Sequence, residues 1–317
     1  MKSLWITIVS FVLALTLTGS PSAADYPPGI MYSTLLNGVT IVANSGQLYL
    51  DNIQAVFLPE PQSSDYYPYN PDTGGAVWST ISTAGGEEIL RFDWYASVLK
   101  KPYWLLDSYK LTDHRTGETG NSGHFKLPSG DYTLDFFLDS GKFYTFDFTV
   151  STVPAKDAFG GDDYWFIDGP WEDWAYFYYA DAKPDQSLHF KVWLRNKEHE
   201  PSKYVTPKLK VFRGGELVCT SREGTSFNLH PAWNRWDMDL IFPMEGTSGG
   251  AYFKAKDLVG TDGSYTAKLY IDDKLYGEWA FKIEGGNFNY TGRTVRGEAD
   301  PLTFIEGGRD AWWYERK

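Results

Sequence analysis

Two stretches of twenty residues in this chain repeat one another without a gap. Residues 131–150 (DYTLDFFLDSGKFYTFDFTV) align with residues 264–283 (SYTAKLYIDDKLYGEWAFKI), 133 positions later. In both stretches apolar residues alternate with more polar ones on either side of a turn, Asp139–Lys142 in the first copy and Asp272–Lys274 in the second. A period of two is typical of a strand with one buried face, and two such strands around a short turn predict a β-hairpin. The repeat therefore predicts two related antiparallel β domains.

Further alternating segments lie upstream of each hairpin. Residues 90–94 and 188–194 alternate in the same way, and each is followed by another strand-like segment, at 108–111 and 208–212. The first of these pairs is offset by 98 residues, against 133 for the hairpins, which places an insertion in the second copy near residues 230–259. Many short strands, with no helical period of any length, indicate tandem antiparallel sandwiches.

The start of each hairpin resembles a known structural element. Asp262–Ala267 (DGSYTA) is similar to the tyrosine corner of immunoglobulin-like domains, with Tyr265 at the corner, and Ser129–Leu134 (SGDYTL) is the matching stretch in the first copy. The resemblance implies that the tyrosine ring fills one end of the core while its hydroxyl bonds nearby backbone. It is a resemblance of fold and names no activity.

Together these features predict an all-β protein of two tandem antiparallel immunoglobulin-like β-sandwiches with a short C-terminal extension. We expect the sandwiches at residues 50–153 and 160–285. An N-terminal segment at 25–49 precedes them, and a tail at 286–317 follows.

The tail carries a partial copy of an earlier motif. Phe166–Tyr176 (FIDGPWEDWAY) recurs as Phe304–Tyr314 (FIEGGRDAWWY), 138 positions later. An unpaired apolar strand promotes aggregation unless it is covered, so we expect the tail to pack back on the second sandwich. Two alternatives stay open: the tail is the remnant of a longer array, or its strand completes a neighbouring subunit.

The first residues predict export. Lys2 precedes an apolar run from Leu4 to Leu17, and Ser22–Ala24 forms a small-x-small cleavage pattern, so we expect a signal peptide at residues 1–24. The run is shorter than the roughly 20 residues of a membrane-spanning helix, and no later segment is apolar enough to span a bilayer. The mature chain is expected in the periplasm or outside the cell.

Cysteine content and charge narrow the class of protein. Cys219 is the single cysteine, so no internal disulfide can form, which favours a bacterial exported protein over a eukaryotic one, and we expect its thiol in the core. The chain has 29 Lys and Arg against 41 Asp and Glu, a formal net charge of −12. This balance disfavours nucleic-acid partners and anionic membranes. Oligomeric state is left open.

Aromatic residues make up 17% of the chain and provide the candidate ligand contacts. Flat aromatic side chains stack on sugar rings, and the candidates are four tryptophans with two neighbouring aspartates: Trp233, Trp236, Asp237, Asp239, Trp171 and Trp174. Trp171 and Trp174 are expected mainly to pack where the domains meet. Trp233 and Trp236 are the stronger candidates because they lie in the predicted insertion.

Two acidic groups offer other chemistry. Asp237 and Asp239 share one face of a strand, and with Glu245 they form the hypothesis of a glycan hydrolase. A second group carries the oxygen ligands that a structural Ca²⁺ prefers: Asp162, Asp163, Asp168, Glu172 and Asp173. The five histidines show no transition-metal spacing, so no catalytic residue and no other cofactor is predicted.

The function expected from the sequence is that of an exported, non-catalytic binding or structural protein that contacts carbohydrate or another protein. The alternatives are a secreted glycan hydrolase acting through Asp237 and Asp239, or an assembly subunit that donates its C-terminal strand.

Overall fold

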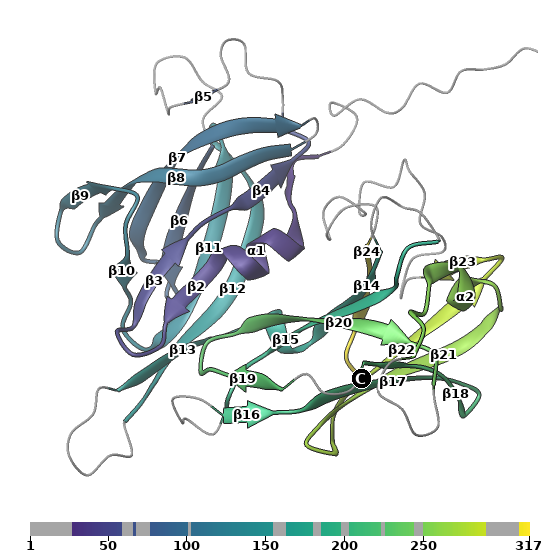
Figure 1. The fold of residues 1–317 in the computed structure, drawn as a ribbon. Helices are drawn as coiled ribbons and strands as arrows, with labels where there is room; N and C mark the ends of the chain where they lie inside the picture. Colours follow the sequence, from purple (N-terminus) through teal and green to yellow (C-terminus); the bar gives the residue numbers. More distant parts are fainter. Residues whose placement is uncertain are drawn as a thin grey trace, which may run out of the picture.

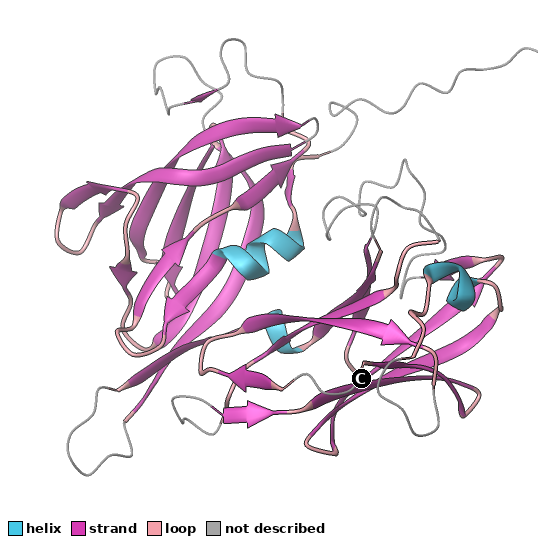
Figure 2. Cartoon of the chain, viewed as in Figure 1, coloured by secondary structure: helices cyan, strands magenta, loops and turns pink. Residues whose placement is uncertain are grey.

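The computed structural model describes residues 27–58, 66–67, 77–100, 103–154, 163–179, 185–197, 203–222, 226–243, 250–289 and 311–317, with only the main chain at 66–67, 96–100 and 103. These residues form antiparallel sheets and two short α-helices, α1 (Tyr32–Gly38) and α2 (Ala255–Val259) (Figures 1 and 2). The predicted all-β antiparallel class is confirmed. The predicted signal peptide at residues 1–24 lies outside the described residues.

The first sheet is a run of antiparallel strands built from the N-terminal half of the chain. Its order is β1 (Gly29–Ile30), β4 (Ile53–Val56), β8 (Tyr103–Asp113), β7 (Glu88–Lys100), β6 (Val77–Thr83), β11 (Gly130–Leu138), β12 (Gly141–Val153) and β13 (Tyr164–Asp168). Two short strands extend it, β5 (Tyr66–Tyr67) beside β7 and β9 (Glu118–Asn121) beside β8. A small sheet of β10 (Phe125–Lys126), β3 (Gln47–Leu50) and β2 (Val39–Val42) accompanies it.

The second sheet runs from β23 to the C-terminal strand. Its order is β23 (Asn287–Asn289), β22 (Lys274–Glu284), β21 (Gly263–Ile271), β17 (Pro207–Arg213), β18 (Glu216–Ser221), β20 (Asn234–Ile241), β15 (His189–Leu194), β14 (Trp174–Tyr178) and β24 (Ala311–Glu315). A separate pair, β16 (Lys203–Val205) and β19 (Phe227–Leu229), lies beside it. Arg316 bridges to Trp279 of β22, so the sheet curls until its two ends approach.

The two sheets share one strand order. The order β4-β8-β7-β6-β11-β12 in the first has its counterpart in β15-β20-β18-β17-β21-β22 of the second, and in both cases the chain visits these places in the same succession. In this order β15 takes the place of β4, and β17 the place of β6. The sequence alignment of 188–194 with 90–94, and of 208–212 with 108–111, was therefore wrong, because 90–94 lies in β7 and 108–111 in β8.

The strand order also bears on the predicted insertion at 230–259. Residues 234–241 of that segment form β20, which pairs with β15 and β18 and takes the place that β8 takes in the first sheet. Residues 234–241 are thus part of the shared strand order, and an insertion in the rest of 230–259, of which 244–249 lie outside the described residues, stays a prediction.

The two predicted hairpins are present, in matching register. Tyr132 lies opposite Phe148 in the first hairpin, and Tyr265 lies opposite Phe281 in the second. Each hairpin shifts register at the same place, directly after Phe136 in β11 and directly after Leu269 in β21. The predicted hairpins at residues 131–150 and 264–283 are therefore confirmed, and their registers match residue by residue.

A buried tyrosine fixes the loop before each hairpin. The Tyr132 hydroxyl donates to the carbonyl of Pro128 at 2.8 Å, and the Tyr265 hydroxyl donates to the carbonyl of Thr261 at 2.6 Å. Both rings are buried. In each hairpin the hydroxyl thus bonds the backbone four residues upstream, which holds the loop against the end of the core.

The C-terminal strand pairs with the strand that carries the earlier copy of its motif. β24 pairs antiparallel with β14, so Trp313 lies opposite Tyr176. Trp312 and Tyr314 turn to the core, where Trp312 stacks on Phe288 with ring centroids 4.5 Å apart. Within residues 311–317 the tail packs back on the second sheet, as expected, while residues 290–310 lie outside the described part of the chain.

The chain passes between the sheets through the segment Gly169–Asp173, which contains a turn of 3-10 helix, η2 (Pro170–Glu172). The strand before it, β13, pairs with β12, and the strand after it, β14, pairs with β15. β13 thus belongs to the first sheet, although the sequence placed its residues in the second domain. α1 lies on the side of the first sheet that faces the second, and its Tyr32 ring contacts Trp174 and Trp313 edge-on (Figure 1).

Candidate functional site

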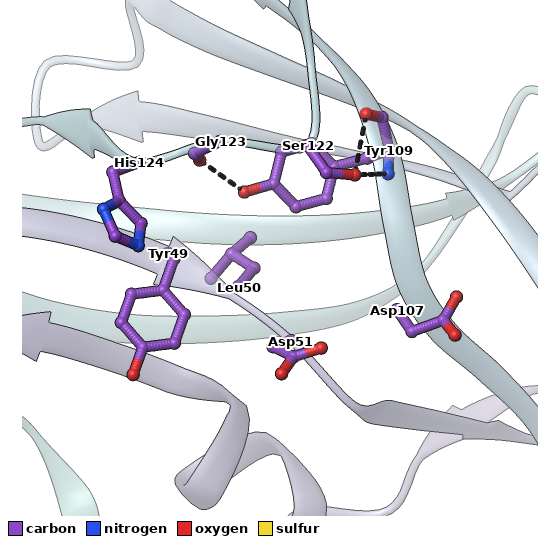
Figure 3. A pocket seen from close by; sticks show the side chains of 8 residues that line it. All are labelled: Tyr49, Leu50, Asp51, Asp107, Tyr109, Ser122, Gly123 and His124. Atoms are coloured by element: carbon purple, nitrogen blue, oxygen red, sulfur yellow. Dashed lines mark hydrogen bonds between the residues drawn. The ribbon is translucent and has the colours of Figure 1, made fainter.

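A pocket of about 410 Å³ opens on the first sheet, where three separate segments meet. Tyr49 and Leu50 end β3, and Asp51 follows them. Asp107 and Tyr109 come from β8, and the segment 122–124 joins β9 to β10. Figure 3 shows the lining residues: Tyr49, Leu50, Asp51, Asp107, Tyr109, Ser122, Gly123 and His124.

The back of the pocket is held rigid by Tyr109. Its buried hydroxyl donates to the carbonyl of Gly123 at 2.8 Å. Its backbone N–H donates to the Ser122 hydroxyl at 2.7 Å, and that hydroxyl lies 3.2 Å from the Tyr109 carbonyl, to which it donates. Burial raises the pKa of the Tyr109 phenol, so it stays a neutral donor at physiological pH. The hydroxyls of Tyr109 and Ser122 are therefore both engaged within the wall.

Two rings form one side of the opening. The Tyr49 and His124 rings lie 5.1 Å apart between centroids, with their planes inclined at 36°. His124 is fixed by Gln47, whose Oε1 lies 3.3 Å from its Nδ1. Because such rings offer flat apolar faces beside polar edges, this side suits a ligand with a flat apolar face of its own.

Two carboxylates form the other side. The Asp51 carboxylate accepts a hydrogen bond from the Asn52 side chain at 2.7 Å. Asp107 has no hydrogen bond or ion pair with any described residue, and no Lys or Arg is among the described residues that line the pocket. In Figure 3 both carboxylates lie on the side away from His124. The carboxylate oxygens on this side that no described residue engages are hydrogen-bond acceptors.

The six residues predicted from the sequence lie elsewhere, in the second sheet and at the junction. Trp171 is fully buried, and its indole N–H donates to the carbonyl of Leu36 in α1. Trp174 is half-buried between Tyr32 and Trp313. Both rings therefore pack where the two sheets meet, as expected for the motif that contains them.

Trp233 also lies at the junction. Its indole N–H donates to the carbonyl of Ile167 in β13 at 2.7 Å. The Arg195 guanidinium lies 5.1 Å from the Trp233 ring and 4.3 Å from the Phe166 ring, and it donates to Asp168 at 2.6 Å. These contacts give Trp233 a place in the packing between the sheets, and its role in ligand binding stays a prediction.

Trp236, Asp237 and Asp239 lie on β20, with Trp236 on the opposite face from the two aspartates. The half-buried Trp236 ring packs against the Phe227 ring, with the two ring centroids 4.2 Å apart. Asp237 and Asp239 share one strand face, as predicted, and each places a carboxylate oxygen 3.1 Å from Nδ1 of His189. Lys191 adds a second cation, 3.2 Å from Asp237.

These partners decide what Asp237 can do. Burial on its own would raise the pKa of Asp237, but the hydrogen bond from His189 and the charge of Lys191 outweigh it and hold that pKa below its usual range. A general acid for glycoside hydrolysis needs a raised pKa, so that it is protonated at neutral pH. The lowered pKa of Asp237 does not favour the acid role, and the hydrolase hypothesis stays a prediction, since Glu245 lies outside the described residues.

Three of the five acidic residues considered for Ca²⁺ lie beside cations of the protein, and Asp173 is one of them, 3.9 Å from Arg316. Asp168 pairs with Arg195, and Glu172 accepts bonds from Lys197 and Arg316. Asp163 is exposed, and Asp162 lies outside the described residues. In the part of the chain that the structure describes, no group of three or more His, Cys, Asp or Glu side chains is arranged to hold a metal ion.

Sequence reasoning missed the pocket residues. Tyr49, Asp107 and His124 stand far apart in the chain, each in a segment without a motif, and only the pairing of β3 with β10 and the path of β8 bring them together. The sequence of each segment alone predicts an ordinary strand end or turn and gives no sign of a binding site.

Comparison with known proteins gives no relative: no protein-family model, no curated protein and no solved structure matches this chain significantly. Among the described residues, no helix has the length and apolar character needed to cross a membrane.

Proposed function

We propose that this chain is an exported, non-catalytic carbohydrate-binding protein built from two immunoglobulin-like units, with its binding site in the pocket of the first unit. The observation that carries the proposal is the pocket itself, in which the ring pair Tyr49 and His124 is set against the carboxylates of Asp51 and Asp107. Rings that stack on a sugar and carboxylates that accept from its hydroxyls are the two kinds of contact that carbohydrate sites combine.

The strand order supports the immunoglobulin-like part of the proposal. In that fold one sheet has the order A-B-E-D and the other has C, F and G. In the first unit, β1-β4-β8-β7 matches the order A-B-E-D and β6-β11-β12 the order C-F-G, and the two runs are joined in one sheet because β7 also pairs with β6. In the second unit, β14-β15-β20-β18 and β17-β21-β22 match in the same way, joined by the pair β17 and β18. The tyrosines that begin β11 and β21 stand where the F strand begins, as in a tyrosine corner.

The sequence supports export. The apolar run with a small-x-small end is a signal-peptide pattern, and a chain with one cysteine fits a bacterial exported protein whose units are held by apolar cores. The buried free thiol of Cys219 agrees with that interpretation.

Calorimetric titration of the mature chain, from Asp25 onward, against a panel of oligosaccharides tests the proposal. We expect at least one sugar to bind, and Tyr49→Ala to weaken its binding at least tenfold, because a stacking ring is lost. Tyr204→Ala is the matched control, since Tyr204 is 74% exposed in the second unit. Absence of binding across the panel, or equal affinity in the Tyr49 variant, would contradict the proposed function.

The two alternatives have specific tests. A hydrolase acting through Asp237 and Asp239 requires hydrolytic activity that is lost on replacing both residues by alanine. A strand-donating subunit requires oligomers that disappear when residues 304–317 are deleted, as measured by light scattering.

A further inference from the structure

We infer that the pocket selects an amino sugar, a hydroxylated ring that carries a protonated amine, over neutral and acidic sugars. This inference rests on the proposed function and names the class of ligand for the same site.

On the side of the pocket formed by Asp51 and Asp107, the side-chain groups available to a ligand are acceptors. The hydroxyls of Tyr109 and Ser122 are donors that the protein uses itself, toward the carbonyls of Gly123 and Tyr109. The carboxylates of Asp51 and Asp107 are acceptors. A ligand that enters must supply the donors on this side, and an ammonium group supplies three while accepting none.

The negative charge of the lining also favours a ligand that donates hydrogen bonds and carries a positive charge. Two carboxylates line the pocket, and the described residues of the lining contain no Lys or Arg to neutralise them. Asp107 has neither a hydrogen bond nor an ion pair in the described part of the chain, although its side chain is partly buried. A partly buried carboxylate gains most from a charged donor, because a hydrogen bond to a charged group is about twice as strong as a neutral one.

The aromatic side adds to this preference. Tyr49 and His124 line the same pocket as the carboxylates, and Figure 3 shows the two rings on the side away from Asp107. A tyrosine face attracts a cation within about 6 Å through its quadrupole. The net charge of −12 on the whole chain favours the approach of a cationic ligand and opposes that of a uronic or sulfated sugar.

The test compares oligomers that differ in one group. Glucosamine oligomers, N-acetylglucosamine oligomers and glucose oligomers of equal length are titrated into the mature chain at neutral pH and low salt. We expect the glucosamine oligomer to bind about tenfold or more tightly than the other two, since one bond to a charged group is gained. The preference should shrink as salt is added.

Two isosteric variants assign the preference to the pocket. Asp107→Asn and Asp51→Asn should each weaken glucosamine-oligomer binding about tenfold and leave any binding of the acetylated oligomer nearly unchanged, because only the charge is removed. Glu87→Gln removes one exposed charge outside the lining and is the control for overall charge. Circular dichroism and the melting temperature show whether each variant keeps its fold.

The outcomes separate the inference from the proposed function. Equal or tighter binding of the acetylated or glucose oligomers overturns the inference and leaves carbohydrate binding standing. An unchanged preference in both aspartate variants also overturns it, because the selectivity then lies outside this pocket. If no oligomer binds, the proposed function fails as well.

Discussion

The indole nitrogen of Trp171 donates a hydrogen bond to the backbone carbonyl of Leu36, 2.6 Å away and 135 residues earlier in the chain. Trp171 stands in the connection between the sheets, and Leu36 is part of α1 beside the first sheet. The ring is fully buried and meets Phe146 of β12 edge-on at 5.4 Å. One side chain of the connecting segment thus anchors it to the first sheet.

Removing this ring should loosen the junction. Trp171→Ala is expected to lower the free energy of unfolding by about 3–5 kcal/mol, because it leaves a large cavity and an unpaired carbonyl. Trp171→Phe keeps most of the ring and should cost less. Scanning calorimetry measures this loss. We expect the alanine variant to melt in two transitions, one for each sheet, because the sheets are no longer coupled through Trp171. An alanine variant that melts in one step at the original temperature would contradict this view of the junction.

Glu172 should make the stability of the junction depend on pH. Burial alone would raise the pKa of Glu172, but hydrogen bonds from Lys197 and Arg316 outweigh it and lower that pKa. A lowered pKa in the folded state adds stability above the unfolded value of about 4.3 and loses it as pH falls through the folded value. Glu172→Gln should therefore cost about 1 kcal/mol at neutral pH and almost nothing in acid.

Urea denaturation of wild type and Glu172→Gln across acid and neutral pH measures this difference. Glu216→Gln is the control, since Glu216 is 78% exposed and 3.9 Å from Arg213. A Glu172→Gln cost that stays constant down to low pH would show that the charge is not its cause.

The two tyrosine hydroxyls should contribute alike. Tyr132→Phe and Tyr265→Phe each remove a hydrogen bond to the carbonyl four residues upstream and keep the ring. We expect each to cost about 1 kcal/mol in chemical denaturation. The exposed Tyr204→Phe should cost nothing measurable. If neither core variant differed from Tyr204→Phe, the hydroxyls would not be fixing the loops.

The C-terminal strand should stabilise its own chain. Tyr314 is fully buried against Phe177 and Phe281, so Tyr314→Ala is expected to cost about 3–5 kcal/mol. Its neighbour Glu315 is exposed, and Glu315→Ala should cost almost nothing. Because the strand pairs within one molecule, the melting temperature should not depend on protein concentration. A melting temperature that rises with concentration would favour donation of the strand between copies.

The sequence predicted the hairpins well because their signal is local. The alternation around Asp139 and Asp272 fixes which residues face the core and where the chain turns, and the pairing of Tyr132 with Phe148 follows from it. Upstream the same signal failed, since every half-buried strand alternates. The alignment based on alternation matched 188–194, which contains β15, to 90–94 in β7, although β15 takes the place of β4 in the strand order. The predicted insertion followed from that mismatch.

The candidate sites show the same limit. That Asp237 and Asp239 share a face was predictable from their spacing on a strand, but the partner between them, His189, comes from β15 and could not be foreseen. The pocket depends on pairing between strands that are far apart in the sequence. The pairing of β3 with β10 brings Tyr49 and His124 together although they are 75 positions apart in the chain.

Matching registers create a hazard that the core residues counter. Strands of two hairpins so alike could pair with the wrong partner while the chain folds, a failure typical of repeated domains. In the first hairpin Leu134 faces Phe146, and in the second Ala267 faces Trp279. A crossed pairing would press Leu134 against the larger Trp279 and leave a void between Ala267 and Phe146, and both mismatches cost free energy. The unequal division of volume across each pair thus lets each strand distinguish its own partner from its near copy.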